Sequence, residues 1–465
     1  MLLAPLLGIA PRPHSLARSL EGVREALEAG LPSRAAAELV RVAEFQPWRT
    51  ELWESAGGYA LQGADLQAAL AYLQHSAALD VLSPRGYLAL GDVYQQAGDL
   101  EAALQSWDTT QQSGIQADEI APRLLAVHRA LGDIQAVIAD LQALTNLRPA
   151  DVQMRYQLGL YLAAHQPEEA LAHLAQVADL EPALKPQAEA VLSSIRAASR
   201  ADDPAYTLLE SGRAMASLGE WGLAAEAFQG AVDLRPDYAE AWAYLGEARQ
   251  HLDPDGSASQ VSPGLAELTK AVQLDPASLV ANTFLALYWQ RQGETSRALQ
   301  VLEEITQLYP ENPALLSELG NALAQTGNLQ AALAAYQGAV SLAPDVPDYW
   351  RLLASFSARY EYQIAAAGLP AARRAVALDP GNPANLDVLG QVLLLLQDFT
   401  SAERFFQRAV GADPNYAAGH VRLGLVYALR GEMDPAFNKW KQVELAAPGS
   451  TAADQAQRLL DNYFP

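Results

Sequence analysis

The sequence predicts an all-α fold, an α-solenoid of about twelve antiparallel helix–turn–helix hairpins with capping helices. The first observation behind this prediction is the stretch 311–344, where two apolar stripes with helical spacing flank a break at Thr326-Gly327-Asn328. Apolar residues three and four apart share one face of a helix, and so short a break folds two helices back against each other. Pro344 ends the second helix because proline lacks an N–H and clashes with the preceding turn.

The second observation is that this hairpin recurs. One hairpin cannot bury both of its faces, so copies must stack in a row. In the second half of the chain the closing prolines lie 34 to 40 residues apart. They are Pro236, Pro276, Pro310, Pro344, Pro380, Pro414 and Pro448, and the first helices carry Leu90-Gly91, Leu158-Gly159, Leu245-Gly246, Leu319-Gly320, Leu389-Gly390 and Leu423-Gly424.

The third observation is the composition. A chain of 465 residues is too long for one compact core, whereas a row of units has no such limit because each contacts only its neighbours. Half of the residues are hydrophobic and 18% are charged, which favours helices buried on two sides over a disordered chain.

The order Leu319-Gly320, Ala332, Tyr336, Ala339 and Pro344, with a period of 34, resembles the tetratricopeptide repeat (TPR). The resemblance covers nearly the whole chain. It implies a right-handed superhelix whose concave surface receives an extended peptide or a helix of a partner. The resemblance predicts an architecture but does not identify a ligand.

The first part of the chain is irregular. Residues 1–14 are expected to form an N-terminal arm, and residues 15–200 a first array of about five degenerate repeats. Pro182 and Pro236 are separated by one repeat plus the length of one helix, so residues 185–199 form an unpaired helix. This helix either caps the first array or lies inside one continuous superhelix. We expect a domain boundary at residues 200–204.

The second array, residues 205–448, is more regular and holds about seven repeats. One repeat carries an insertion at residues 251–263, and the repeat that ends at Pro380 is two residues longer at residues 359–368. Residues 451–465 form the C-terminal capping helix. Glycine inside a helix costs about 1 kcal/mol relative to alanine, so its recurrence needs a packing reason. We expect Gly320 to lie opposite the small Ala332 of the second helix, with Tyr336 filling the space toward the next repeat.

The formal net charge is −23, from 54 acidic and 31 basic residues. Such a surface repels phosphate backbones, so we expect no nucleic-acid partner. It would steer a neutral or basic polypeptide toward the chain, although the acidity also serves solubility alone. Without cysteine, the chain has no disulfide, thiolate metal site or thiol nucleophile.

The apolar residues Met1–Ala10 are too few to span a bilayer and lack a basic flank. We therefore expect no stable membrane span and a cytoplasmic protein. The alternative is an exported or membrane-associated protein, if residues 1–10 are a remnant of a signal or anchor.

No catalytic, cofactor-binding or metal site is predicted. His165 and His173 are eight residues apart, whereas two ligands on one helix face need four. Asp253-Pro254-Asp255-Gly256 lacks the later glycine and glutamate of a calcium loop. We find no phosphate-binding loop, nucleophile elbow or dinucleotide fingerprint. The sequence predicts a protein that is not an enzyme and needs no cofactor.

The resemblance places a set of polar side chains on the concave face of the second array. An arginine there can hold a carboxylate or a carbonyl, but the alternative is that these arginines pair with Glu240, Glu247 and Asp348 of the chain itself. The four lysines are too scattered to form the lysine and asparagine set with which some family members hold a terminal carboxylate. The candidate partner contacts are Tyr206, Arg213, Glu240, Glu247, Thr283, Arg291, Ser317, Asn321, Gln325, Arg351, Ser355 and Arg359.

Three functions remain open. The first is a non-catalytic scaffold or adaptor that binds a peptide or helix of a partner in the groove. The second is a structural subunit of an envelope complex or of a self-assembled complex, and the third is a regulatory or substrate-docking subunit of a separately encoded enzyme. Exposed apolar residues in the groove would favour the first function, and exposed apolar residues at one end or on the outer face would favour the second.

Overall fold

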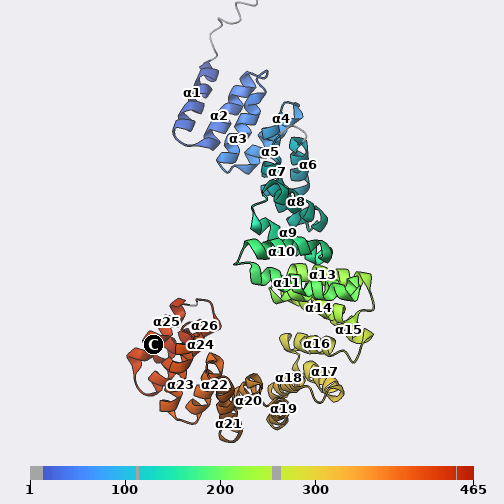
Figure 1. The fold of residues 1–465 in the computed structure, drawn as a ribbon. Helices are drawn as coiled ribbons and strands as arrows, with labels where there is room; N and C mark the ends of the chain where they lie inside the picture. Colours follow the sequence, from blue (N-terminus) through green and yellow to red (C-terminus); the bar gives the residue numbers. More distant parts are fainter. Residues whose placement is uncertain (1–13, 112–114, 254–262, 447, 465) are drawn as a thin grey trace, which may run out of the picture. The chain divides into compact units, whose positions relative to one another are not determined.

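The computed structural model describes residues 14–111, 115–253, 263–446 and 448–464, and these ranges hold 26 α-helices and no strand (Figure 1). The predicted all-α solenoid is therefore confirmed. Twelve helix pairs, a lone helix after the fifth pair and a final helix account for all 26. The right-handed winding implied by the family resemblance stays an expectation.

Five pairs precede the lone helix. They are α1 (His14–Glu28) with α2 (Pro32–Phe45), α3 (Glu51–Gln62) with α4 (Leu66–Ala78), α5 (Pro84–Ala97) with α6 (Leu100–Gln111), α7 (Ala117–Leu131) with α8 (Ile134–Leu147), and α9 (Val152–His165) with α10 (Pro167–Leu180). The lone helix α11 (Lys185–Ala198) is followed by a 3₁₀ turn, Ser199–Ala201.

Seven pairs and a last helix follow. They are α12 (Pro204–Ser217) with α13 (Trp221–Leu234), α14 (Ala239–Leu252) with α15 (Leu265–Leu274), α16 (Leu279–Arg291) with α17 (Thr295–Leu308), α18 (Pro313–Gln325) with α19 (Leu329–Leu342), α20 (Pro347–Arg359) with α21 (Leu369–Leu378), α22 (Pro383–Leu395) with α23 (Phe399–Ala412), and α24 (Ala417–Leu429) with α25 (Met433–Ala446). The last helix, α26 (Thr451–Tyr463), packs on α24 and α25.

The chain forms two compact units, residues 1–227 and residues 228–465. The division falls within α13, whereas α11 and α12, on the two sides of residues 200–204, pack against each other. A domain boundary at residues 200–204 stays a prediction. The expected arm at residues 1–14 and the insertion at residues 251–263 lie largely outside the described residues.

The hairpin turns follow from local chemistry. Gly327, between α18 and α19, has φ +84°, a left-handed conformation that glycine adopts without steric cost. The side chain of Asn328 then accepts a hydrogen bond from the backbone N–H of Ala331 and caps α19. Asn312 caps α18 in the same way, and Pro313 occupies its first turn, where no N–H is needed. Asn312 and Asn328 thus pair with backbone N–H groups at the helix starts that have no partner within the helix.

The recurring glycines make room for the large ring of the second helix. A Cβ atom added to Gly320 would lie 3.0 Å from Cδ2 of Tyr336, and one added to Gly390 would lie 2.5 Å from Cε1 of Phe406. The expectation that Gly320 lies opposite Ala332 is therefore wrong. The ring itself packs onto the glycine, because only a residue without a side chain leaves space for a flat ring between two helices.

The longer repeat that ends at Pro380 contains a π-helical turn, Ile364–Gly368, which leads into α21. Glu361 and Gln363 before it have positive φ angles of 49° and 52°. A Cβ atom on Gly368 would come within 2.8 Å of Cβ of Ser357, so this turn lies close against α20. The two additional residues are thus taken up by a wider helical turn.

We expect Gly390→Ala to lower the free energy of unfolding by about 1–3 kcal/mol, because the new methyl group overlaps the ring of Phe406. Urea denaturation followed by circular dichroism would measure this effect. Gly411→Ala is the matched control, since nothing lies within 4 Å of its added Cβ and alanine favours the helix. An equal or higher stability for Gly390→Ala would contradict the packing described.

Candidate functional site

In the second compact unit, first helices of neighbouring pairs pack side by side. Helix α14 contacts α16, α18 contacts α20, α20 contacts α22, and α22 contacts α24. The predicted partner contacts of this unit lie on these helices. Their polar side chains therefore meet neighbours from the adjacent repeat, and the geometry decides which of them remain available to a partner.

Arg291 on α16 is paired within the chain. Its two terminal nitrogens donate to the carboxylate of Glu247 on α14 at 2.6 and 2.9 Å, and one of them also donates to Gln250 at 2.9 Å. The hydrogen bonds to Glu247 raise the pKa of Arg291. Glu247 is only 7% exposed, so Arg291 neutralises a buried carboxylate. Here the structure supports the alternative of intramolecular pairing.

Two more of the candidate arginines have acidic neighbours on their own helix. Arg351 donates to Asp348 at 2.8 Å, and Arg213 donates to Glu210 at 2.6 Å. Arg359 is exposed, its guanidinium lies 5.8 Å from the ring centre of Tyr360, and it forms no ion pair within the described residues. Arg359 therefore keeps its charge available.

The other candidates differ in exposure. Ser317 is 4% exposed and donates to the carbonyl of Pro313, so it offers a partner little surface. Asn321 is half-buried and accepts a 3.4 Å hydrogen bond from Gln325. Gln325 is exposed, and the half-buried candidates are Tyr206, Glu240, Thr283, Asn321, Arg351 and Ser355.

Sequence reasoning missed Asp387, a carboxylate inside the leucine-rich helix α22. It is 3% exposed and accepts hydrogen bonds from Arg422 at 2.7 Å, Gln391 at 2.9 Å and Tyr416 at 3.2 Å. Burial raises its pKa, while Arg422 acts in the opposite direction. Its position between apolar neighbours in the sequence was the available signal.

Glu318 on α18 was also missed. Burial raises its pKa, and its charge contributes to raising the pKa of Tyr336, which itself is raised mainly by burial. A half-buried carboxylate without an ion pair among the residues described is costly to ionise.

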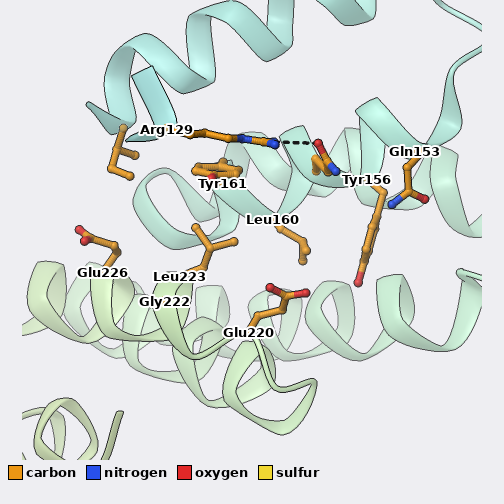
Figure 2. A pocket seen from close by; sticks show the side chains of 11 residues that line it. Arg129, Gln153, Tyr156, Leu160, Tyr161, Glu220, Gly222, Leu223 and Glu226 are labelled. Carbon is orange, nitrogen blue, oxygen red and sulfur yellow. Dashed lines mark hydrogen bonds between the residues drawn. The ribbon is translucent and has the colours of Figure 1, made fainter. Parts of the chain in front are cut away.

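The first compact unit holds a pocket of about 480 Å³ between α7, α8, α9 and the start of α13 (Figure 2). Arg129 donates to Gln157 at 2.8 Å, and its guanidinium lies 5.6 Å from the ring centre of Tyr161. Figure 2 shows Glu220 and Glu226 on the opposite side, on the segment that forms α13. The pocket is lined by Arg129, Ile134, Gln153, Tyr156, Gln157, Leu160, Tyr161, Glu220, Gly222, Leu223 and Glu226.

Across the part of the chain that the structure describes, no three His, Asp or Glu side chains come together as a metal site would require. Within the same ranges, no helix has the length and apolar character needed to cross a bilayer.

Comparison with known families decides the nature of the repeats. Tetratricopeptide repeat models match residues 209–252, 290–356, 365–417 and 388–450. The chain contains tetratricopeptide repeats in these residues. The repeats are a protein-interaction architecture, since a row of hairpins presents an extended binding surface, and such families are typically non-catalytic.

Curated relatives match only part of this chain. The "Peroxisomal targeting signal receptor" of Komagataella phaffii is 36% identical over 117 residues, which is 24% of this chain and 18% of the relative. The receptor of the same name from Pichia angusta is 35% identical over 105 residues, or 22% of this chain and 16% of the relative. The chain thus matches under a fifth of the length of these relatives.

Two solved structures align with the chain at low sequence identity. "Crystal Structure of the Yeast Tom70" is 12% identical, covers 97% of this chain and 95% of its own, and has a TM-score of 0.43. "MamA 41-end from Desulfovibrio magneticus RS-1" is 22% identical, covers 38% of this chain and 98% of its own, and has a TM-score of 0.33.

Glu318 predicts a pH dependence of stability. Because burial raises its folded pKa above the ordinary value of 4.5, the folded state holds the proton more tightly than the unfolded state. The carboxyl therefore contributes stability at low pH, and this contribution is lost as the pH rises through the folded pKa. We expect the advantage of Glu318→Gln over the wild type in urea denaturation to be larger at about pH 7.5 than at about pH 4.5.

The exposed Glu303→Gln, on the neighbouring α17, is the control for the loss of one negative charge. An advantage of Glu318→Gln that stays constant across this range, or that grows as the pH falls, would contradict the assigned direction.

Proposed function

We propose that the chain is a non-catalytic adaptor that binds an extended or helical segment of a partner protein along the first helices of the second array. The observation that carries this proposal is that Asn321 on α18 and Arg359 on α20 keep polar groups available on two adjacent first helices. The two helices pack together, Arg359 has no ion pair with a described residue, and the amide N–H groups of Asn321 donate to no described residue. Such groups can hold a peptide backbone or a carboxylate.

The remaining contacts follow from exposure. We propose Tyr206, Arg213, Glu240, Thr283, Gln325, Arg351 and Ser355 as further contacts. Arg291 contributes to the proposed surface indirectly, by pairing with the buried Glu247. Ser317 contributes in the same indirect way, by donating a hydrogen bond to the carbonyl of Pro313 within its own helix. The net charge of −23 favours a neutral or basic partner and disfavours nucleic acid.

One further point supports a polypeptide ligand. The curated relatives that match part of the chain are named as receptors of a targeting signal, which supports recognition of a protein segment. A cytoplasmic location stays part of the proposal, as does the alternative of an exported or membrane-associated protein. A docking role for a separately encoded enzyme is a special case of the same adaptor function.

We expect the double variant Asn321→Ala, Arg359→Glu to weaken partner binding about tenfold or more, which is about 1.4 kcal/mol, while leaving the melting temperature nearly unchanged. Quantitative affinity capture from native lysate, compared with the wild type, would measure this loss. Arg373→Glu on the second helix α21 is exposed and reverses the same charge, so it is the control. Equal recovery of every partner by both variants would refute the assignment.

One observation favours assembly as a second candidate function. Among the residues that the structure describes, the two most exposed large apolar side chains are Leu445 at 80% and Trp48 at 73%. They lie on α25 and in the loop after α2, in the terminal repeats of the two arrays. Apolar side chains exposed to this degree are frequent at interfaces between proteins.

If these side chains mediate self-association, Trp48→Ser with Leu445→Ser should shift the protein toward the monomer in concentration-dependent light scattering. Leu180→Ser, which removes a 60% exposed leucine from the end of α10, is the control. A wild type that is monomeric at all concentrations would remove this candidate.

A further inference from the structure

The pocket of the first compact unit owes its existence to the lone helix α11. Because α11 has no partner helix, α12 packs both on α11 and on α9. Ser211 of α12 is fully buried and donates to the carbonyl of Ala163 on α9 at 2.6 Å, which fixes this arrangement. The start of α13 consequently faces α9, with the pocket between them (Figure 2).

The two sides of the pocket differ in charge. Arg129 is held on one side by its hydrogen bond to Gln157 and by the ring of Tyr161. Glu220 and Glu226 on the other side form no ion pair with any residue that the structure describes. Arg129 is therefore held against its own wall of the pocket, and the two carboxylates on the other side have no ion pair with a described residue.

An unpaired hydroxyl points into the same space. Tyr156 is only 8% exposed, and its hydroxyl has no hydrogen-bond partner among the described residues. Figure 2 shows the hydroxyl directed toward the side of the pocket where Glu220 lies. The charge of Glu220 adds to the effect of burial in raising the pKa of Tyr156, so this hydroxyl stays protonated and able to donate. This hydroxyl borders the open space of the pocket, where it can donate to a ligand or to water.

We propose that this pocket binds an arginine or lysine side chain of an extended partner polypeptide, with Glu220 and Glu226 holding the cation. Glu220 and Glu226 are exposed, and their carboxylates can accept hydrogen bonds from a guanidinium or ammonium group. Tyr156 donates to a backbone carbonyl of the same segment.

The size and shape of the pocket favour a polypeptide over a small cation. A volume of about 480 Å³ exceeds the space of one side chain and leaves room for adjoining backbone. Gln153 lines the pocket and offers an amide to that backbone. This site lies on helices of the first array and goes beyond the proposed contacts on α18 and α20.

The proposal is tested by fluorescence anisotropy with a labelled glycine–serine peptide that carries two spaced arginines, at about 0.15 M salt so that distant charges are screened. Two matched peptides replace both arginines by neutral citrulline or by glutamate. We expect the arginine peptide to bind the full chain, and the matched peptides to bind about tenfold more weakly or less. Absence of binding by the arginine peptide would overturn the proposal.

Charge-matched variants separate the pocket from the acidic surface. Glu220→Gln with Glu226→Gln should raise the dissociation constant about tenfold. Glu168→Gln with Glu169→Gln removes two charges from the exposed start of α10 and should change it about twofold or less. Equal losses in the two double variants would mean that net charge alone attracts the peptide, and would overturn the site.

Two further measurements test the nature of the ligand. Tyr156→Phe should weaken binding about threefold without lowering the melting temperature, since only an unpaired hydroxyl is removed. Arginine ethyl ester should displace the peptide only at far higher concentration than the unlabelled peptide. Displacement at similar concentrations would show that the pocket takes a small cation, and would overturn the assignment to a polypeptide.

Discussion

The contact between a glycine of the first helix and a large side chain of the second is the constraint that brings the two helices together in the hairpins that carry this glycine. At Gly424 the neighbour is Trp440, whose indole N–H also donates to the carbonyl of Val421 at 2.9 Å. At Gly159 the same place is taken by Leu174. Because the glycine has no side chain, the ring or leucine reaches the backbone of the first helix, and the two helices approach closely. The stack of repeats can form only once this approach is made.

The two arrays use this hairpin differently. In the second array, several successive first helices pack side by side, and charged side chains pair between them, as Arg291 does with Glu247. Arginines in such pairs are less available to a binding partner. Arg359 forms no ion pair with a described residue, so its charge remains available. In the first array, the unpaired α11 breaks the alternation of first and second helices and opens a polar pocket beside α9. This pocket therefore arises where the repeat pattern is irregular.

Much of the fold was predictable from the sequence, whereas little of the binding site was. Proline spacing, Leu-Gly pairs and turn glycines depend on interactions within one hairpin, so they predicted the twelve pairs, the lone helix and the final helix. The roles of Arg291, Glu247 and Asp387 depend on contacts between repeats, and equivalence of position does not reveal them. The partner of Gly320 was misjudged for a related reason, since spacing cannot tell whether Ala332 or Tyr336 faces it.

The sequence by itself determined the type of repeat, the number of hairpins and the acidic character of the surface, because these follow from local periodicity and composition. The tertiary structure alone decided which polar side chains form hydrogen bonds or ion pairs within the chain and which remain available to a binding partner. Glu220 and Tyr156 are 64 positions apart in the chain and share one pocket only because α12 packs on α9. The proximity of these two side chains depends on how the helices pack in three dimensions. The spacing of residues along the sequence does not predict it.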